Sequence, residues 1–213
     1  MPTATANKTE ITLKGSVDIV SDFFFTAINS ILYQRGIYMP ETFSKESKYG
    51  LTVMTTTDEG LLNYLQNVQK QVAEWLMNGL VQRLVLVVQG VDSTETLERW
   101  QFNVAVEGES GENMVPNVSK GGSNKSIKEV HDEIQAIIRQ ITASVTFLPL
   151  LQEPCTFDLL VYTDKEVMAP EKWADSDPCY ILNSTEVKLR SFTTSVHKID
   201  SMVSYKEADE WDI

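Results

Sequence analysis

The sequence predicts an α+β domain in which a mostly antiparallel sheet is backed by three helices. Three segments place apolar residues at the three- and four-residue steps of an amphipathic helix. Between and after them lie short apolar or alternating segments that are typical of strands. Hydrophobic residues make up 42% of the 213 positions, which is enough for a packed core. This order of elements favours helices gathered on one face of a sheet.

The first half of the chain supplies two of the helices. Residues 16–33 carry an apolar stripe that a glycine and a proline then break. Residues 49–56 predict a short strand. Asp58 is a good N-cap for a second helix, and Gly79 ends it. The core positions of this helix recur at helical spacing: Leu61, Leu65, Val68, Val72, Trp75 and Leu76.

The middle of the chain predicts a β-hairpin followed by a long loop. Residues 83–88 are almost wholly apolar, as in a buried strand, and residues 98–106 alternate apolar and polar side chains. A turn-like segment at 90–93 joins them. Residues 108–125 are rich in Gly, Ser and Asn and are long for a connection within a domain, so we expect a mobile surface loop.

The third helix has the clearest start signal in the chain. Ser126 and Glu129 form an S-x-x-E capping box. Branched apolar residues then keep helical spacing over about five turns, which predicts the central core helix: Ile127, Val130, Ile134, Ile137, Ile141 and Val145. Pro149 ends the pattern, and residues 156–163 predict the next strand.

The last part of the chain, residues 165–213, differs from the rest. Its strand-like run at 187–205 is polar, alternates poorly and carries many hydroxyl groups. Such a segment buries little apolar surface, so it is expected to be the least stable part of the fold. It is either an ordinary edge hairpin or a segment that packs in more than one way.

Charge and composition exclude several classes of partner. The net charge is -12 and no run of Lys and Arg exceeds two residues, so neither nucleic acid nor an anionic membrane surface is expected to bind. The longest apolar stretch, 84–88, is far short of a membrane span. Residues 1–10 lack the apolar core of a secretory signal and are expected to be a flexible N-terminus.

Motifs for catalysis or for cofactor binding do not occur. GxGxxG, GxxxxGK[ST], CxxC and HExxH are missing, so we expect no cofactor, no metal site and no enzymatic activity. His131 lies beside acidic residues on a polar helix face, and His197 is interpreted as structural or interfacial rather than as a general base. Cys155 has no basic neighbour in sequence that would activate its thiol.

One helix face does have the composition of an interface. The later turns of the third helix, around Arg139 and Gln140, carry a single charge among small residues. Protein interfaces are depleted in charge but enriched in arginine. The pattern therefore predicts a docking surface, although a quiet solvent-facing surface fits it equally well.

Seven longer blocks span nearly the whole chain and are far more specific than any short motif. They are INSILYQRGIY at 28–38, KYGLT at 48–52, LERWQF at 97–102, IRQITASVTFLPLL at 138–151, FDLLVYTDKE at 157–166, PEKW at 170–173 and VKLRSFTTSVHKIDSMVSYK at 187–206. Together they resemble the spindle-checkpoint members of the HORMA-domain family. The resemblance covers about residues 11–206.

This resemblance implies a HORMA domain at 11–213, with a core at 11–164 and a mobile "safety belt" at 165–213. In the open form the belt covers one edge of the sheet. In the closed form it moves to the other edge and encloses a partner peptide, which adds a strand. The implied function is to delay anaphase; the alternative is a fixed-conformation adaptor such as the translesion-polymerase accessory relative.

The family also implies partners and places of action. The implied partners are a kinetochore coiled-coil receptor, the activator of the anaphase-promoting complex, and a second copy of the chain in an open–closed dimer. A closed-form adaptor with a hexameric ATPase would reset the switch. Such proteins act in the nucleus and cytoplasm, and at kinetochores in mitosis.

Matching positions give candidate site residues. For peptide binding these are Phe157, Leu159, Val161, Tyr162, Trp173 and His197. For pairing of an open and a closed copy they are Arg35, Arg139, Gln140, Phe147 and Arg190. Leu13, expected to be buried, and Trp75 match positions linked to conformational preference. The hydroxyl-rich run separately predicts regulatory phosphorylation at Ser195 and Ser201.

Overall fold

The computed structural model describes residues 11–106, 125–163 and 173–207. The predicted flexible N-terminus, residues 108–124 of the predicted loop, and residues 165–172 and 208–213 of the predicted belt lie outside these ranges. The helices are α1 (Leu13–Gln34), α2 (Glu59–Met77) and α3 (Ile127–Ala143), with short 3-10 turns at Pro40–Thr42 and Ser144–Thr146. The strands are β1 (Phe43–Lys48), β2 (Leu51–Thr56), β3 (Val81–Gly90), β4 (Thr96–Val106), β5 (Cys155–Thr163), β6 (Ser184–Thr193) and β7 (His197–Lys206).

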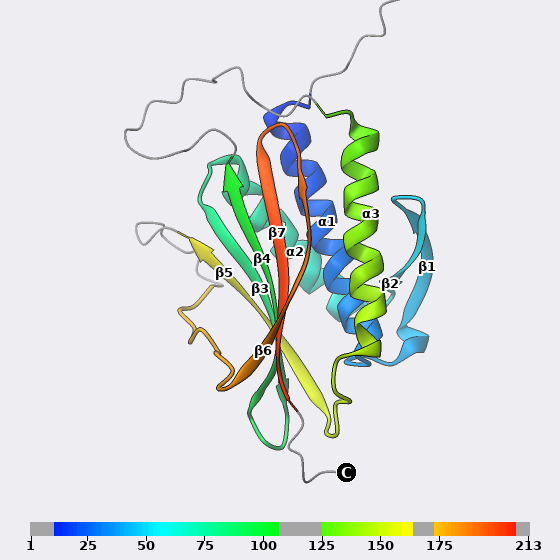
Figure 1. Cartoon of the computed structure of the whole chain (residues 1–213), viewed down its shortest axis with the longest axis vertical. Coiled ribbons are helices and arrows are strands. Elements are labelled where there is room, and N and C mark those ends of the chain that lie inside the picture. The colour runs from blue at the N-terminus through cyan, green and yellow to red at the C-terminus, as the bar shows by residue number, and fades with distance from the viewer. Residues whose placement is uncertain (1–10, 107–124, 164–172, 208–213) are drawn as a thin grey trace, which may run out of the picture.

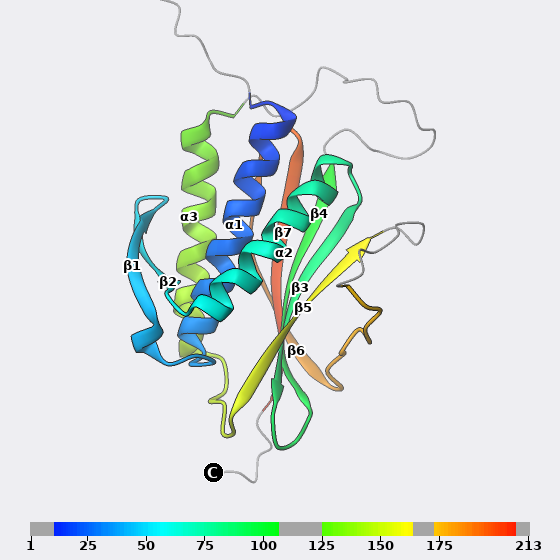
Figure 2. The same cartoon turned by 180° about the vertical axis from the view of Figure 1, so that it is seen from behind.

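A five-stranded antiparallel sheet in the order β5-β3-β4-β7-β6 forms the centre of the molecule. The three helices lie together on one face of this sheet, with α1 between α2 and α3 (Figures 1 and 2). The helix-facing side chains of β3 and β4, among them Leu86, Trp100 and Phe102, are fully buried against the helices. This confirms the predicted α+β architecture.

The three predicted helices are confirmed, and side-chain caps explain where they begin. The Thr12 hydroxyl accepts a hydrogen bond from the Gly15 amide, and Asp58 accepts one from the Leu61 amide. The capping box of Ser126 and Glu129 is present at the start of α3.

Two of the residues expected on the core stripe of α3 are exposed. The helix ends at Ala143, before Val145, because the chain turns into a 3-10 segment there. The exposed fractions are 46% for Ile127 and 41% for Val145. The four residues between them on the stripe are fully buried, so the core face of the helix is shorter than its apolar pattern.

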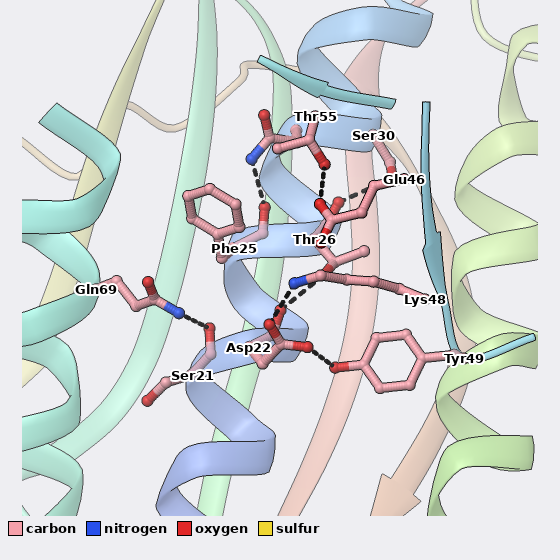
Figure 3. A network of polar contacts seen from close by, with 11 residues as sticks. Ser21, Asp22, Phe25, Thr26, Ser30, Glu46, Lys48, Tyr49, Thr55 and Gln69 are labelled. Carbon is pink, nitrogen blue, oxygen red and sulfur yellow. Dashed lines mark hydrogen bonds and ion pairs between the residues drawn. The ribbon is translucent and has the colours of Figure 1, made fainter. Parts of the chain in front are cut away.

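The sequence pattern missed β1, because its residues are polar. β1 pairs with β2 in a separate two-stranded sheet, and Tyr49 and Gly50 form the tight turn with φ angles of 52° and 70°. Asp22 of α1 accepts hydrogen bonds from the Lys48 ammonium and the Tyr49 hydroxyl, both at 2.5 Å (Figure 3). Burial, with help from Asp22, raises the pKa of Tyr49. The hairpin is thus fastened to α1 by polar contacts.

Helix α1 is long and apolar enough, by length and composition alone, to cross a membrane. In this fold 72% of that apolar window is buried. Ala27, Ile31 and Leu32 have no exposed surface. The hydrophobicity of α1 is therefore accounted for by its position between the sheet and the other two helices.

Candidate functional site

Strand β5 forms one end of the sheet. Its inner side pairs with β3 from Val81↔Thr163 to Gly90↔Cys155, and within the described residues no strand pairs with its outer side. A row of unpaired amide and carbonyl groups is the template on which a further strand can add. The predicted peptide-binding strand therefore has a free edge in this structure.

The side chains of β5 alternate between two environments. Phe157, Leu159 and Val161 belong to the helix-side core, and the Phe157 ring contacts the rings of Tyr38 and Tyr64 with centroid distances of 6.1 and 5.9 Å. Leu160 and Tyr162 face the opposite side of the sheet. The four predicted residues of β5 are thus divided between the two faces, and a captured strand would share the backbone edge with all of them.

The C-terminal strands occupy the other end of the sheet. The predicted strand-like run is divided into β6 and β7, which pair with each other with an irregularity between Lys188 and Ser191. β7 pairs with β4 over its whole length, from Glu98↔Tyr205 to Val106↔His197. In Figure 1 this orange-red hairpin lies on the opposite side of β3 and β4 from the yellow β5. This placement matches the closed arrangement that the family resemblance implies.

A buried polar cluster docks this hairpin onto the start of α1. The Ser16 hydroxyl lies 2.7 Å from His197 Nδ1 and 2.6 Å from the Thr194 hydroxyl. Burial lowers the pKa of His197, which keeps the ring neutral at pH 7. His197 was a candidate for peptide binding, but it lies on β7 and is 1% exposed. It is not at the β5 edge, so we leave it out of the peptide site.

The segment before β6 wraps around the free edge of β5. On the helix face, the Trp173 ring packs edge-on against Trp75 of α2 at 4.8 Å. On the other face, Cys179 packs with Val85, Val87 and Leu160. From here on, the belt means residues 173–183, the described part of the predicted safety belt that precedes β6, and the hairpin means β6 and β7. Because the belt has contacts on both faces of the sheet, it passes outside the edge to which a strand would add.

The residues proposed for pairing of two copies do not all lie on one surface. Arg139 is exposed on α3, the Gln140 side-chain oxygen accepts the Arg190 amide at 2.7 Å, and Phe147 is 42% exposed. Arg35 differs, because its side chain is 5% exposed and paired with Glu98 at 2.5 Å. In this conformation Arg35 stabilises the interior and presents no side chain to a partner.

The candidate switch and phosphorylation residues lie around the docked hairpin. Leu13, expected to be buried, is 41% exposed, because it is the first residue of α1 and projects from the helix start. Trp75 is buried, as the belt contact requires. The Ser195 hydroxyl donates to the Ile11 carbonyl, whereas Ser201 is buried within β7 and its hydroxyl has no hydrogen-bond partner among the described residues.

Three residues that fasten the C-terminal part of the chain carry no signal in the sequence. Ser16 and Thr194 hold His197, and Arg99 bonds to the belt at Pro178. Arg99 occupies a polar position of an alternating strand, which the pattern alone assigns to solvent. In the structure Arg99 is buried among Gln101, Tyr162 and the belt residues Pro178 and Tyr180.

The described residues contain no group of three or more His, Cys, Asp or Glu side chains placed to hold a metal ion. Burial raises the pKa of the Cys155 and Cys179 thiols, which disfavours the nucleophilic thiolate. At the outer edge of β5 the site offers main-chain hydrogen bonding to an added strand, with the belt closing over that edge.

A sheet edge enclosed by a C-terminal segment is the architecture of a peptide-capturing domain. The HORMA domain model matches residues 16–197, and the chain belongs to the HORMA-domain family. Within this family it is a spindle-checkpoint protein. It is 53% identical over 210 residues to "Mitotic spindle assembly checkpoint protein MAD2A" of Dictyostelium discoideum, covering 99% of this chain and 100% of the relative.

Two further comparisons agree with this placement. The MAD2A protein of Homo sapiens is 54% identical over 196 residues, covering 92% of this chain and 93% of the relative. A chain in the "Crystal Structure of Mitotic Checkpoint Complex" is 44% identical, with a TM-score of 0.80, covering 91% of this chain and 99% of that one. A DNA polymerase zeta processivity subunit of Schizosaccharomyces pombe is 25% identical over 173 residues, so the adaptor alternative has weaker support.

Proposed function

We propose that this chain inhibits anaphase by capturing an extended segment of a partner at the outer edge of β5 and holding it under the belt. The segment comes from a kinetochore coiled-coil receptor or from the activator of the anaphase-promoting complex. The protein acts in the nucleus and cytoplasm and at mitotic kinetochores, and it works by binding and not by catalysis.

The observation that carries this proposal is the path of the belt around β5. The belt contacts the helix face through Trp173 and Trp75, and it contacts the opposite face at Pro178, Cys179 and Tyr180. A strand added to β5 would lie inside this enclosure. Its backbone would pair with β5, and side chains of both faces would line its sides. Selectivity would then come from the side-chain pockets, and general affinity from the main chain.

Release from such a site requires part of the protein to unfold. The belt continues directly into β6, and β7 is hydrogen-bonded to β4 along its length. The captured strand can leave sideways only after the hairpin or the belt has detached. Dissociation is then governed by local unfolding of the carrier and is slow even for a modest contact area.

A truncation tests whether the hairpin is needed for capture. A chain that ends at Val203 loses Ser204–Lys206, which pair with the Glu98–Arg99 part of β4 and with the start of β6. We expect it to lose long-lived capture of synthetic peptides that tile the activator of the anaphase-promoting complex. Co-elution of a labelled peptide in gel filtration measures the loss.

The matched control ends at Glu207 and keeps every residue of β7. It is expected to capture the peptide as the full chain does. Circular dichroism checks that both shortened chains are folded. If the chain ending at Val203 retained the peptide as long as the full chain, capture under the belt would be contradicted.

We also propose that an open and a closed copy of the chain pair through the exposed end of α3, around Arg139, Gln140, Phe147 and Arg190. The bond between the Gln140 side chain and the Arg190 amide supports this, because it joins α3 and β6 into one surface. The pair would be reset by a closed-form adaptor with a hexameric ATPase.

Charge reversal tests this surface. Arg139→Glu is expected to abolish the dimer while peptide capture is retained, because Arg139 is exposed on α3, which packs against α1 and β6. Sedimentation velocity on a mixture of peptide-loaded and peptide-free protein measures the dimer. Lys128→Glu is the control, since Lys128 lies on the same helix and its side chain is 85% exposed. An undiminished dimer with Arg139→Glu would contradict this assignment.

A further inference from the structure

We propose that Arg99 is a positioning residue that fastens the belt across the sheet face opposite the helices. This inference rests on the proposed capture of a peptide at β5. It assigns to one side chain the control of how long the captured segment stays bound.

The sheet holds the Arg99 guanidinium in a fixed position. Arg99 lies on β4 with 5% of its surface exposed. Its Nη1 donates to the Gln101 side-chain oxygen at 3.0 Å, and its Nη2 donates to the Tyr162 hydroxyl at 2.9 Å. Tyr162 belongs to β5, so the guanidinium bridges from an inner strand to the edge strand that would receive the peptide.

The remaining contacts of the guanidinium are with the belt. Nε donates to the Pro178 carbonyl at 3.1 Å, and the guanidinium carbon lies 4.8 Å from the centre of the Tyr180 ring. The planar guanidinium can donate these hydrogen bonds while it stacks on an aromatic ring, and a lysine ammonium cannot do both. Arg99 therefore joins β4, β5 and the belt through one planar group.

This contact is the counterpart of the tryptophan pair on the other face. Trp173 holds the start of the belt against Trp75, and Arg99 holds it again five to seven residues later, at Pro178 and Tyr180. A belt fastened at both faces keeps the edge enclosed. With the Arg99 contact removed, the belt keeps on this face the packing of Cys179 against Val85, Val87 and Leu160. It loses its hydrogen bond and its ring contact there, so it lifts from the sheet more readily.

The chemistry of the contact makes it reversible. The guanidinium donates to an amide oxygen, a hydroxyl and a carbonyl among the described residues, and all three acceptors are uncharged. A buried cation with neutral acceptors recovers only part of the hydration that it loses. When the belt lifts, water regains access to Arg99, which offsets part of the lost bonds. The contact therefore slows opening of the belt without preventing it.

The test compares Arg99→Ala and Arg99→Lys with the wild type. The first readout needs no ligand: hydrogen exchange of the amides in residues 173–183 of the free protein, followed by mass spectrometry. The second is the dissociation rate of a labelled peptide selected on the wild-type protein from a displayed random library. With Arg99→Ala, we expect exchange and dissociation to become about tenfold faster, because a charge-assisted bond and a stacked ring are lost. Arg99→Lys should fall between the two.

Arg83→Ala is the matched control for loss of an arginine from this face. Arg83 lies on β3, donates to the Asn103 side chain at 2.7 Å and stacks on the Tyr162 ring at 5.3 Å, without a described belt partner. Exchange at 173–183 is expected to stay at the wild-type rate. If Arg99→Ala fails to fold, Tyr180→Leu replaces it, since Tyr180 is 69% exposed and only its ring contact is lost. This variant should speed dissociation by about two- to fivefold.

The outcomes separate the two proposals. Exchange and dissociation equal to wild type in the Arg99 variants would overturn the role of Arg99 and leave capture intact. Failure of the wild-type protein to hold any selected peptide would overturn capture, and the exchange measurement would still decide whether Arg99 fastens the belt. An equal acceleration with Arg83→Ala would show a general loss of packing and would also overturn this role.

Discussion

Replacing Ser201 with glutamate is expected to drive the C-terminal hairpin off the sheet and to abolish peptide capture. Ser201 lies in the middle of β7, pairs with Phe102 and is 4% exposed. A carboxylate there would be buried at a position where the serine hydroxyl itself has no hydrogen-bond partner among the described residues. We expect the free energy of unfolding to fall by about 3–5 kcal/mol. Urea denaturation and peptide co-elution measure the two effects.

Two other serine variants separate charge from the loss of a hydroxyl. Ser201→Ala is expected to be neutral or slightly stabilising, because the hydroxyl it removes has no described hydrogen-bond partner. Ser195→Glu should have a smaller effect than Ser201→Glu, since Ser195 is half-buried at the turn between the strands and binds the Ile11 carbonyl. Equal capture by the wild type and Ser201→Glu would contradict the prediction.

The same geometry bears on the proposed phosphorylation of Ser201. A kinase needs the serine in an extended, accessible segment, whereas Ser201 is enclosed while β7 is paired with β4. Modification would therefore occur on chains whose hairpin has detached. The added charge of about -1.5 to -2 would then oppose re-docking into the apolar site.

The second large effect is expected at the buried ion pair between α1 and β4. Arg35 Nε donates to Glu98 Oε1 at 2.6 Å, and Trp100 Nε1 donates to Glu98 Oε2 at 3.0 Å. Burial raises the pKa of Glu98, and both donors oppose that rise. Arg35→Ala would leave this carboxyl buried without its cation. We expect a loss of about 3–5 kcal/mol in the free energy of unfolding, measured by denaturant titration.

A double variant provides the control for this pair. Arg35→Leu combined with Glu98→Leu removes both charges and keeps apolar volume, so it is expected to be less destabilising than Arg35→Ala alone. The opposite order of stability would mean that an unpaired Glu98, which keeps its hydrogen bond from Trp100, costs less than its replacement by leucine, and it would contradict this prediction. Both variants also lose the hydrogen bond that Arg35 Nη2 donates to the Pro149 carbonyl, which lowers the stability of each.

The helices could be predicted from the sequence because their signals are local. The capping box at Ser126 and Glu129, the cap at Asp58 and the apolar stripes each depend on residues within a few turns. β3 and β4 were also identified, since one is continuously apolar and the other alternates. The family blocks supplied the belt and the choice of β5 as the binding strand, which the pattern alone left open.

The remaining features depend on long-range packing, which local patterns do not encode. The sequence of β1 has no strand signal because Phe43 is its one buried residue. The position of β1 depends on the contact between Lys48 and Asp22 of α1. The burial of Arg35 and Arg99 depends on residues more than sixty positions away. The pairing of β7 with β4 is likewise accompanied by a contact between residues far apart in sequence, Ser16 of α1 and His197.

The path of the belt has a consequence for partners of different sequence. If the slow step of release is the opening of the belt or the hairpin, the same step limits the dissociation of every captured segment. Segments with widely different association rates should then have similar dissociation rates. The cell could then set the duration of the inhibitory signal by modifying this one protein, without modifying any of its binding partners.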